Sequence, residues 1–390
     1  MADTNELKSK VLADSFFPPK PPPPPPDQDF PGYPDEAAPL PRITRDQIKR
    51  HALALSPYKA PGPDGIPNIV LTKSIDIILD HLYYIYSVTM NLRKYYGPWK
   101  CWTTIVLRKP GKPHYDVAKA YRPIALYNTL SKLLTSTIAE QISYISERHK
   151  LLPPTHFGGR PGRTTTDAMH YITQTVRHAW RNKKVVSALF LDIEGAFPHA
   201  DIDQLTHDLR SRRYPKALAD FIQYSSSNRS TVLKFDDYIS TPITIDCGIG
   251  QGDPPSMAYY IIYNSGLIDV AKGKSECAIA FVDDVVFLAI GADFTETHII
   301  LKDMMTRRHG ALQWAAEHNS NFEFSKLALI DFTLSSLKKQ TSLPLQLPDA
   351  TVHPTPSTKY LGAIFDSRLS WRPQWLQAIS KGTIYMAALR

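Results

Sequence analysis

Cysteine is scarce in this chain of 390 residues, which has only Cys101, Cys247 and Cys277. The three are far apart and odd in number, so they support neither a disulfide framework nor a zinc site. Such scarcity is typical of proteins from a reducing compartment. The cysteine content therefore predicts an intracellular protein.

Long apolar segments are also missing. No run of apolar residues reaches the roughly 18 that a membrane span requires. Met1 is followed by the polar stretch ADTNELKSK, which differs from the apolar core of a signal peptide. We expect a soluble chain with no membrane partner.

Acidic residues are outnumbered by basic ones, 37 against 45, and the formal net charge is +8. This balance permits a polyanionic partner such as nucleic acid without requiring one, because only a fold can gather basic residues into a patch. Hydrophobic residues make up 43% of the chain and charged residues 21%, which excludes wholesale disorder.

Proline is abundant, and 15 of the 33 prolines fall within the first 63 residues. We predict that residues 1–42 are a disordered, proline-rich linker with one short polar helix from Asn5 to Ala13. The run Pro21 to Pro26 favours a stiff polyproline II spacer. Such a run can also serve as a ligand for an aromatic groove of a signalling domain.

The pattern becomes globular from Ile43. Helical spacing predicts long helices over 69–93 and 130–147, and further helices over 202–210, 255–271 and 297–316. Apolar, β-branched runs predict strands over 185–193, 240–250 and 278–291. Strands and helices do not alternate regularly, so the sequence predicts an α+β fold.

Two acids interrupt an otherwise apolar run, AIAFVDDVVFLAIG, over residues 278–291. This pattern predicts a β-hairpin with Asp283 and Asp284 at its turn. Burying an unpaired carboxylate costs several kcal/mol, so we expect the pair at an opening and near a cation. The alternative is a solvent-exposed turn between two core strands.

A third acid, Asp192, ends the apolar run VVSALFLD. One acid at a strand end and two in a hairpin provide the oxygen ligands that hard divalent cations prefer. Two such ions about 4 Å apart can activate an attacking hydroxyl and stabilise a leaving oxygen in phosphoryl transfer. The arrangement requires adjacent strands, which the sequence leaves open.

Nine ordered blocks carry a resemblance to a known family. Five are VVSALFLDIEGAF, GIGQGDPPSMAYYI, FVDD, SKLALIDF and KYLGAIFD, which resemble successive palm motifs of reverse transcriptases. Four lie upstream, SPYKAPGPDGIP, VLRKPGKP, YRPIALYNTLSKLL and HFGGRPGRTTTDA, and resemble finger motifs of non-LTR (LINE-type) retrotransposon polymerases. The resemblance covers about residues 43–370.

The resemblance assigns the acids. Asp192, Asp283 and Asp284 match the family's catalytic aspartates. It implies two Mg²⁺ ions, replaceable by Mn²⁺, with Asp192 and Asp283 as the main ligands. The backbone carbonyl of Ile193 would assist, and Asp284 would support the site from the next position.

Three further positions match residues that select the nucleotide. Phe197 matches the aromatic steric gate, which presses on C2′ of the incoming nucleotide and rejects a 2′-hydroxyl; the alternative is a core aromatic. Gln251 and Gly252 match the loop near the incoming nucleotide and template, where glycine permits close backbone approach. That loop could equally be a turn into the following helix.

Basic residues match phosphate-binding positions of the family. Lys109 and Arg122 would contact the triphosphate, since arginine can clamp two oxygens at once. Arg108 and Lys112 flank Lys109, so which cation reaches the phosphate stays open. For each of these positions the alternative is solvated surface.

Three more cations match positions around the leaving group and the template. Lys326 matches a lysine near which the family protonates pyrophosphate, with a surface lysine as the alternative. Arg160 and Arg163 lie among glycines and hydroxyls and suit the template backbone.

The resemblance implies a right-hand polymerase fold. The reverse transcriptase domain would cover about residues 90–366, with fingers over 43–184 and a palm over 185–366. Residues 367–390 would begin a truncated thumb, with apolar residues of one helix left uncovered. We expect no endonuclease or ribonuclease H domain.

The function that follows is RNA-directed DNA polymerisation by a non-LTR retrotransposon protein. Its substrates would be an RNA template, a DNA primer and deoxynucleoside triphosphates. We expect it in the nucleus, or in the cytoplasm as a ribonucleoprotein. Two alternatives are a catalytically silent or domesticated remnant and a viral RNA-dependent RNA polymerase, and Phe197 argues against the latter.

Overall fold

The computed structural model describes residues 4–22, 32–334 and 343–389. Helices and strands are mixed without a repeating strand–helix–strand order, which confirms the α+β class. The chain forms two compact units, each assembled from separate stretches of sequence. Unit 1 comprises Met1–Leu152 and Gly195–Tyr263, and unit 2 comprises Pro153–Glu194 and Asn264–Arg390. These ranges differ from the predicted fingers and palm, whose boundaries stay predictions.

The sheet of unit 1 is centred on two parallel strands, β1 (Cys101–Arg108) and β5 (Arg229–Phe235). β2 (Tyr121–Leu126) pairs antiparallel with β1. Two short strands, β6 (Tyr238–Ile239) and β7 (Ile243–Ile245), pair antiparallel with β5.

The strand predicted over 240–250 is therefore wrong in extent. Its strand part ends at Ile245, and the glycine-rich stretch that follows is irregular. Gly248 has a φ of +92°, a conformation that an extended strand cannot contain.

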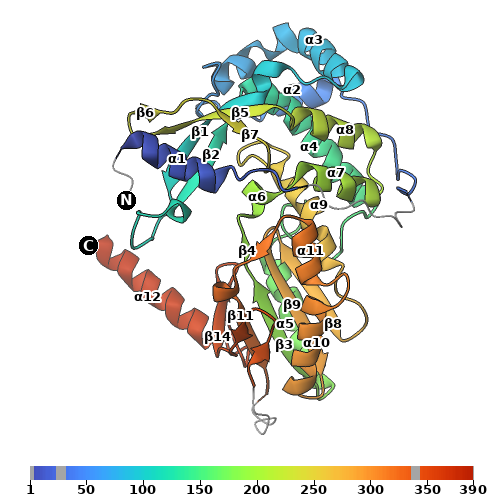
Figure 1. Ribbon diagram of the computed structural model, residues 1–390, viewed down its shortest axis with the longest axis vertical. Coiled ribbons are helices and arrows are strands. Elements are labelled where there is room, and N and C mark those ends of the chain that lie inside the picture. Colours follow the sequence, from blue (N-terminus) through green and yellow to red (C-terminus); the bar gives the residue numbers. More distant parts are fainter. Residues whose placement is uncertain (1–3, 23–31, 335–342, 390) are drawn as a thin grey trace. The chain divides into compact units, whose positions relative to one another are not determined.

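Helices complete unit 1 (Figure 1). The two predicted long helices are present as α3 (Asn68–Leu92) and α4 (Thr129–Arg148). α2 (Arg45–Leu53) begins with a capping box in which Thr44 and Gln47 satisfy each other's backbone donors. The other helices are α1 (Asn5–Phe16), α6 (Ala196–His199), α7 (Ile202–Ser211), α8 (Lys216–Ser225) and α9 (Ser256–Ile268), and α9 continues into unit 2.

The N-terminal residues differ from the predicted linker. The predicted short helix exists as α1, but it is packed, with Leu12 and Phe16 buried against Leu233 of β5. Burial of two large apolar side chains overrides the polar, proline-rich composition around them. Most of the Pro21–Pro26 run lies outside the described residues.

Residues 32–37 are also held in place. The Glu36 carboxylate accepts hydrogen bonds from Arg210 and from the backbone N–H of Lys216, each at 2.8 Å. The Tyr33 ring lies near the His207 ring, with centroids 5.5 Å apart. Lys20 forms an ion pair with Asp203. The described parts of the N-terminal segment therefore run along the first unit as ordered chain, and the prediction of an unpacked linker is wrong for them.

The sheet of unit 2 has the strand order β11-β3-β9-β8, with all neighbours antiparallel. Its members are β11 (Ala328–Phe332), β3 (Val185–Leu191), β9 (Asp284–Gly291) and β8 (Glu276–Phe281). Every residue of β3 is buried, which explains why its sequence is apolar except for Ser187. Val186 and Phe190 share one core with Ile172 of α5 (Thr165–Arg181), and α10 (Phe294–Thr306) also contacts β3 and β9.

The helix predicted over 297–316 is two helices, because the chain breaks at His309, which has a φ of +58°. The second is α11 (Ala311–Glu317). The remaining elements are β4 (Ile193–Glu194), β10 (Asn321–Phe322), β12 (Leu345–Gln346), β13 (Thr351–Val352), β14 (Ser357–Tyr360), β15 (Ala363–Asp366) and α12 (Arg372–Ala388).

The predicted apolar C-terminal helix is α12, and its apolar side chains are exposed. Trp375 is 65% exposed and Tyr385 71%, and no residue described in the helix is buried. This agrees with the predicted uncovered face. Within the described parts of the chain, no helix is long and apolar enough to cross a membrane.

Candidate active site

Asp192 lies at the end of β3, beside the hairpin of β8 and β9. The register between β3 and β9 pairs Leu191 with Val285. Continuing it by one residue places Asp192 opposite Asp284, because antiparallel partners shift by one in each direction. The adjacency that the sequence left open is therefore present in unit 2.

The predicted hairpin is present, but its turn lies one residue earlier than predicted, because Asp284 is the first residue of β9. Phe281 at the end of β8 pairs with Asp284 at the start of β9, and only Val282 and Asp283 lie between them. Both aspartates are exposed, while Val282 before them is buried. The turn thus presents two carboxyl groups at the mouth of an apolar sheet.

The three acids interact electrostatically. Removal from water and the charge of Asp192 raise the pKa of Asp283 above its usual range. Desolvation, followed by the charges of Asp283 and Asp192, raises the pKa of Asp284 to about 6. Carboxyl groups that oppose one another's ionisation are expected where a cation neutralises them.

Lys326 supplies a positive charge to this cluster. Its ammonium group lies 2.6 Å from Oδ2 of Asp192, and both side chains are partly exposed. The neighbouring backbone is also fixed, since the Glu323 N–H donates to the Asp192 carbonyl at 2.9 Å. Ile193 is buried in β4 and pairs with Phe322 of β10. The structure thus brings Asp192, Ile193, Asp283, Asp284 and Lys326 together in unit 2.

The donor set fits magnesium in its chemistry. In the described ranges, no three acidic, histidine or cysteine side chains converge closely enough to enclose an ion. Magnesium usually binds through one or two carboxylates together with substrate phosphates, so a closed protein cage is not required. Three neighbouring carboxyl groups, of which Asp283 and Asp284 have a raised pKa, have the chemistry of such ligands.

Phe197, the predicted steric gate, lies in unit 1. Its ring stacks on the buried ring of Tyr260, with centroids 4.7 Å apart and an interplanar angle of 25°. Its backbone carbonyl accepts a hydrogen bond from the N–H of Ile249 at 2.8 Å. The ring and the backbone of Phe197 are therefore both fixed, as a steric gate requires.

Gln251 and Gly252 lie against β2. The Ala125 N–H donates to the Gln251 carbonyl at 2.8 Å. Gly252 has a φ of +126°, and a Cβ at this position would collide with the Ala125 carbonyl. Glycine is required here for close approach of two backbones.

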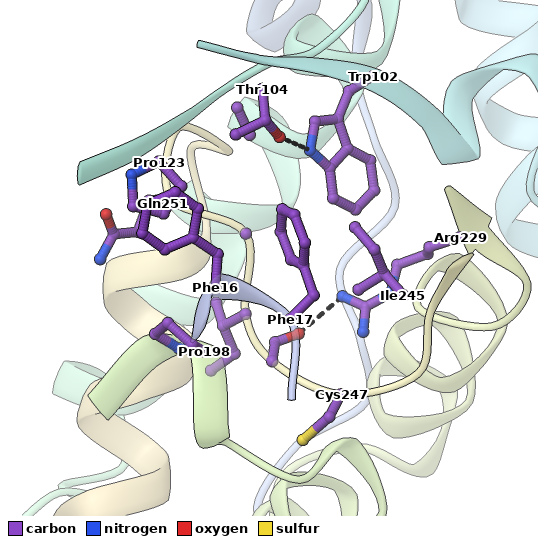
Figure 2. Close-up of a pocket in the computed structure, with 14 residues that line it drawn as sticks. Phe16, Phe17, Trp102, Thr104, Pro123, Pro198, Arg229, Ile245, Cys247 and Gln251 are labelled. Atoms are coloured by element: carbon purple, nitrogen blue, oxygen red, sulfur yellow. Dashed lines mark hydrogen bonds between the residues drawn. The ribbon is translucent and has the colours of Figure 1, made fainter. Parts of the chain in front are cut away.

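A small pocket adjoins this loop (Figure 2). Its volume is about 30 Å³, and Phe16 and Phe17 of the N-terminal segment line it together with Pro198 and Gln251. The Phe17 ring lies beside Trp102 and Ile245. Aromatic side chains from the start of the chain thus reach the loop that contains Gln251.

Lys109 and Arg122 lie on the β1–β2 hairpin of unit 1. The Lys109 ammonium donates to the Lys119 carbonyl at 2.9 Å, across the loop that joins the strands. Arg122 is exposed on β2 and pairs in register with Leu107. Their predicted triphosphate contacts stay predictions.

Arg160 and Arg163 use their guanidinium groups within unit 2. Arg160 is only 8% exposed and donates to the carbonyls of Pro153 and His156, at 2.7 and 3.1 Å. Arg163 donates to the carbonyls of Pro154 and His156. Both arginines stabilise the loop in which they lie. Their predicted contacts to a template backbone gain no support and stay predictions.

The sequence analysis missed Asp253, two residues after Gln251. Its carboxyl group accepts a hydrogen bond from the Thr135 hydroxyl at 2.6 Å, in a cavity of about 40 Å³ that is also lined by tyrosines. Desolvation raises the pKa of Asp253 to about 7. The sequence signal that could have identified Asp253 is its position directly after Gln251 and Gly252.

We expect Asp253→Asn to change how stability depends on pH. Since the folded-state pKa lies above the unfolded value, the wild-type contribution is present below about pH 4 and is lost as pH rises through 7. An amide does not titrate, so on going from pH 5 to pH 8 the free energy of unfolding of the variant should rise by about 3 kcal/mol relative to that of the wild type. Urea unfolding of both proteins at pH 5 and at pH 8 measures their free energies of unfolding. A difference between variant and wild type that is the same at the two pH values would contradict this prediction.

Residues 107–365 match the family model described as reverse transcriptase (RNA-dependent DNA polymerase). The chain is 28% identical over 320 residues to the probable RNA-directed DNA polymerase from transposon X-element of Drosophila melanogaster, covering 80% of this chain and 34% of the relative.

Two further relatives have similar coverage. The chain is 24% identical to the probable RNA-directed DNA polymerase from transposon BS of Drosophila melanogaster, over 86% of this chain and 37% of the relative. It is 25% identical to the RNA-directed DNA polymerase from mobile element jockey of Drosophila funebris, over 86% and 36% respectively. The chain spans about a third of the length of these relatives.

Proposed function

The chain belongs to the reverse transcriptase (RNA-dependent DNA polymerase) family, and we propose that it acts as the RNA-directed DNA polymerase of a non-LTR retrotransposon. The observation that carries the proposal is the pairing of β3 with β9, which sets Asp192 opposite the Asp283–Asp284 turn. The relatives named as RNA-directed DNA polymerases from transposons support the same activity.

The proposed reaction extends a DNA primer on an RNA template. The primer 3′ oxygen bonds to the α-phosphorus of a deoxynucleoside triphosphate, and the bond to the bridging oxygen breaks and releases pyrophosphate. Asp192, Asp283 and Asp284 would hold Mg²⁺, assisted by the Ile193 carbonyl. Two bound ions would activate the attacking hydroxyl and stabilise the leaving oxygen, and Mn²⁺ could replace them.

Other residues take positioning and proton-transfer roles in this proposal. Lys326, now paired with Asp192, would give a proton to the departing pyrophosphate. The Phe197 ring, supported by Tyr260, would exclude a 2′-hydroxyl. Lys109 and Arg122 would neutralise the triphosphate, and Gln251 would contact the sugar or base. We place the activity in the nucleus or in a cytoplasmic ribonucleoprotein.

Primer extension tests the proposal. The purified chain is incubated with a primed RNA template, deoxynucleotides and Mg²⁺, and Asp283→Ala serves as the control. Extension by the wild type alone is expected. A wild-type chain that binds primer–template without extending it would instead indicate a catalytically silent remnant.

A further inference from the structure

Val282, the residue before the two aspartates, has a strained backbone. Its φ is +62°, in the left-handed region that β-branched residues almost never adopt. Such a conformation is energetically unfavourable and persists only where surrounding structure enforces it. Because Val282 directly precedes Asp283, its conformation sets the direction of both carboxyl groups.

Asn264 contacts this strained residue directly. It is fully buried in the part of α9 that belongs to unit 2, and its Nδ2 donates a hydrogen bond to the Val282 carbonyl. The other end of the amide, Oδ1, lies 2.9 Å from Nε2 of the fully buried His156. With Nδ2 donating, Oδ1 must accept, so His156 donates from Nε2. The two bonds fix the amide at both ends.

The backbone around His156 is fixed as well. The Phe157 N–H donates to the Ala280 carbonyl at 2.7 Å, and the Ala280 N–H donates to Thr155 at 3.1 Å. On the other side, Arg160 donates to the His156 carbonyl. The loop is thereby joined to β8, the strand that leads into the turn.

Gly158 brings the same loop against the turn. A Cβ at Gly158 would lie 2.5 Å from the Val282 nitrogen, closer than real Cβ contacts. The turn is therefore restrained by direct backbone contact and by a hydrogen-bonded side chain.

We propose that Asn264 is a positioning residue for the aspartate turn: oriented by His156, it holds the Val282 carbonyl and so maintains the left-handed conformation that directs Asp283 and Asp284. We call His156, Asn264 and Val282 the turn clamp. The proposal rests on the proposed function in one respect, the binding of metal by these aspartates.

The main test is Asn264→Leu, which removes both hydrogen bonds at similar side-chain volume. Mn²⁺ binding to the purified chain is measured by electron paramagnetic resonance, after subtraction of the signal from Asp283→Asn. We expect Mn²⁺ affinity to fall about tenfold, and kcat for primer extension to fall about a hundredfold, since a displacement near 1 Å can have that effect. KM for primer–template should stay within about twofold, because phosphate contacts set that affinity.

A second substitution separates positioning from general stability. Glycine adopts positive φ without strain, so Val282→Gly should make the turn less dependent on Asn264. The loss of Mn²⁺ affinity caused by Asn264→Leu should then be at least about threefold smaller in the Val282→Gly background. Additive effects in this cycle would overturn the proposal.

Ser187→Ala is the matched control. Ser187 is fully buried in the same sheet and donates to Asp331 at 2.6 Å, away from the turn. It should lower thermal stability and leave Mn²⁺ affinity unchanged. The proposal would also be overturned if Asn264→Leu behaved like this control, with lower stability but wild-type Mn²⁺ affinity and kcat.

Two substitutions of His156 test the same proposal if the Asn264→Leu variant does not fold. His156→Gln keeps a donor toward Asn264 and should retain Mn²⁺ affinity, whereas His156→Leu should weaken it; equal affinities would contradict the clamp. Failure of the wild type to extend primers while it binds Mn²⁺ would refute the polymerase function, and the affinities of the variants would still decide the role of Asn264.

Discussion

Asp283→Asn is expected to reduce nucleotide addition about a thousandfold or more while the chain still folds and binds primer–template. The carboxyl group lies at a turn where removal from water and the charge of Asp192 already oppose its ionisation, so an amide there costs little stability. In the proposed mechanism Asp283 is a ligand of a metal that would contribute several kcal/mol to the transition state, and each 1.36 kcal/mol is about tenfold in rate. Asp192→Asn should have the same effect.

Single-turnover extension and filter binding measure the two properties separately. Affinity for nucleic acid depends mainly on phosphate neutralisation, so its dependence on salt should be the same in both proteins. Asp303→Asn is the matched control, because it makes the same change on the exposed surface of α10 in the same unit. Loss of binding in parallel with loss of activity would assign Asp283 a structural role.

Phe197→Ala is expected to raise ribonucleotide incorporation relative to deoxynucleotide by about tenfold to a hundredfold. The ring is held by Tyr260 at 4.7 Å and its backbone by Ile249, so the substitution removes a wall that cannot be rebuilt by a small movement. A steric contact of this size changes discrimination by about 1–3 kcal/mol.

Competition between the two nucleotide types in primer extension measures the ratio. Phe197→Tyr keeps the ring and should keep the discrimination. If Phe197→Ala lowered stability with discrimination unchanged, Phe197 would be a core aromatic of unit 1, the alternative that the sequence left open.

The strands that carry the acids could be predicted from sequence because their signal is local. A continuous apolar run ending in Asp192, and another interrupted by Asp283 and Asp284, are patterns of buried strands. Their adjacency could not be predicted from the patterns alone. The pairing of β3 with β9 joins segments about 100 residues apart, and nothing in either run specifies the other.

The support of the aspartate turn has no local signal. Valine disfavours the left-handed conformation, so sequence rules place it in the strand rather than at the turn. The contact of Asn264 with Val282 is visible only in three dimensions. In hindsight, Asn264 is a polar residue within the apolar helix sequence AYYIIYNSGLI, and such an interruption marks a position worth testing.

Proline content predicted an unpacked N-terminus, yet Phe16 is buried because the sheet of unit 1 offers it an apolar surface. The hydrogen bonds of Arg160 to backbone carbonyls were likewise not predictable from its loop sequence. Both observations depend on tertiary partners, and the proposed contact of Arg160 with a template stays a prediction.

The discontinuous make-up of the two units affects the order in which the protein can fold during synthesis. β3 emerges from the ribosome about 93 residues before its neighbour β9, and its other neighbour, β11, follows only at residues 328–332. Until then, a strand that is apolar except for Ser187 has no partner for its backbone groups, a state that favours aggregation. Pairings at such long sequence separation also slow folding. We therefore expect folding of unit 2 to depend on late-synthesised residues, and chaperone binding to favour nascent chains that expose β3.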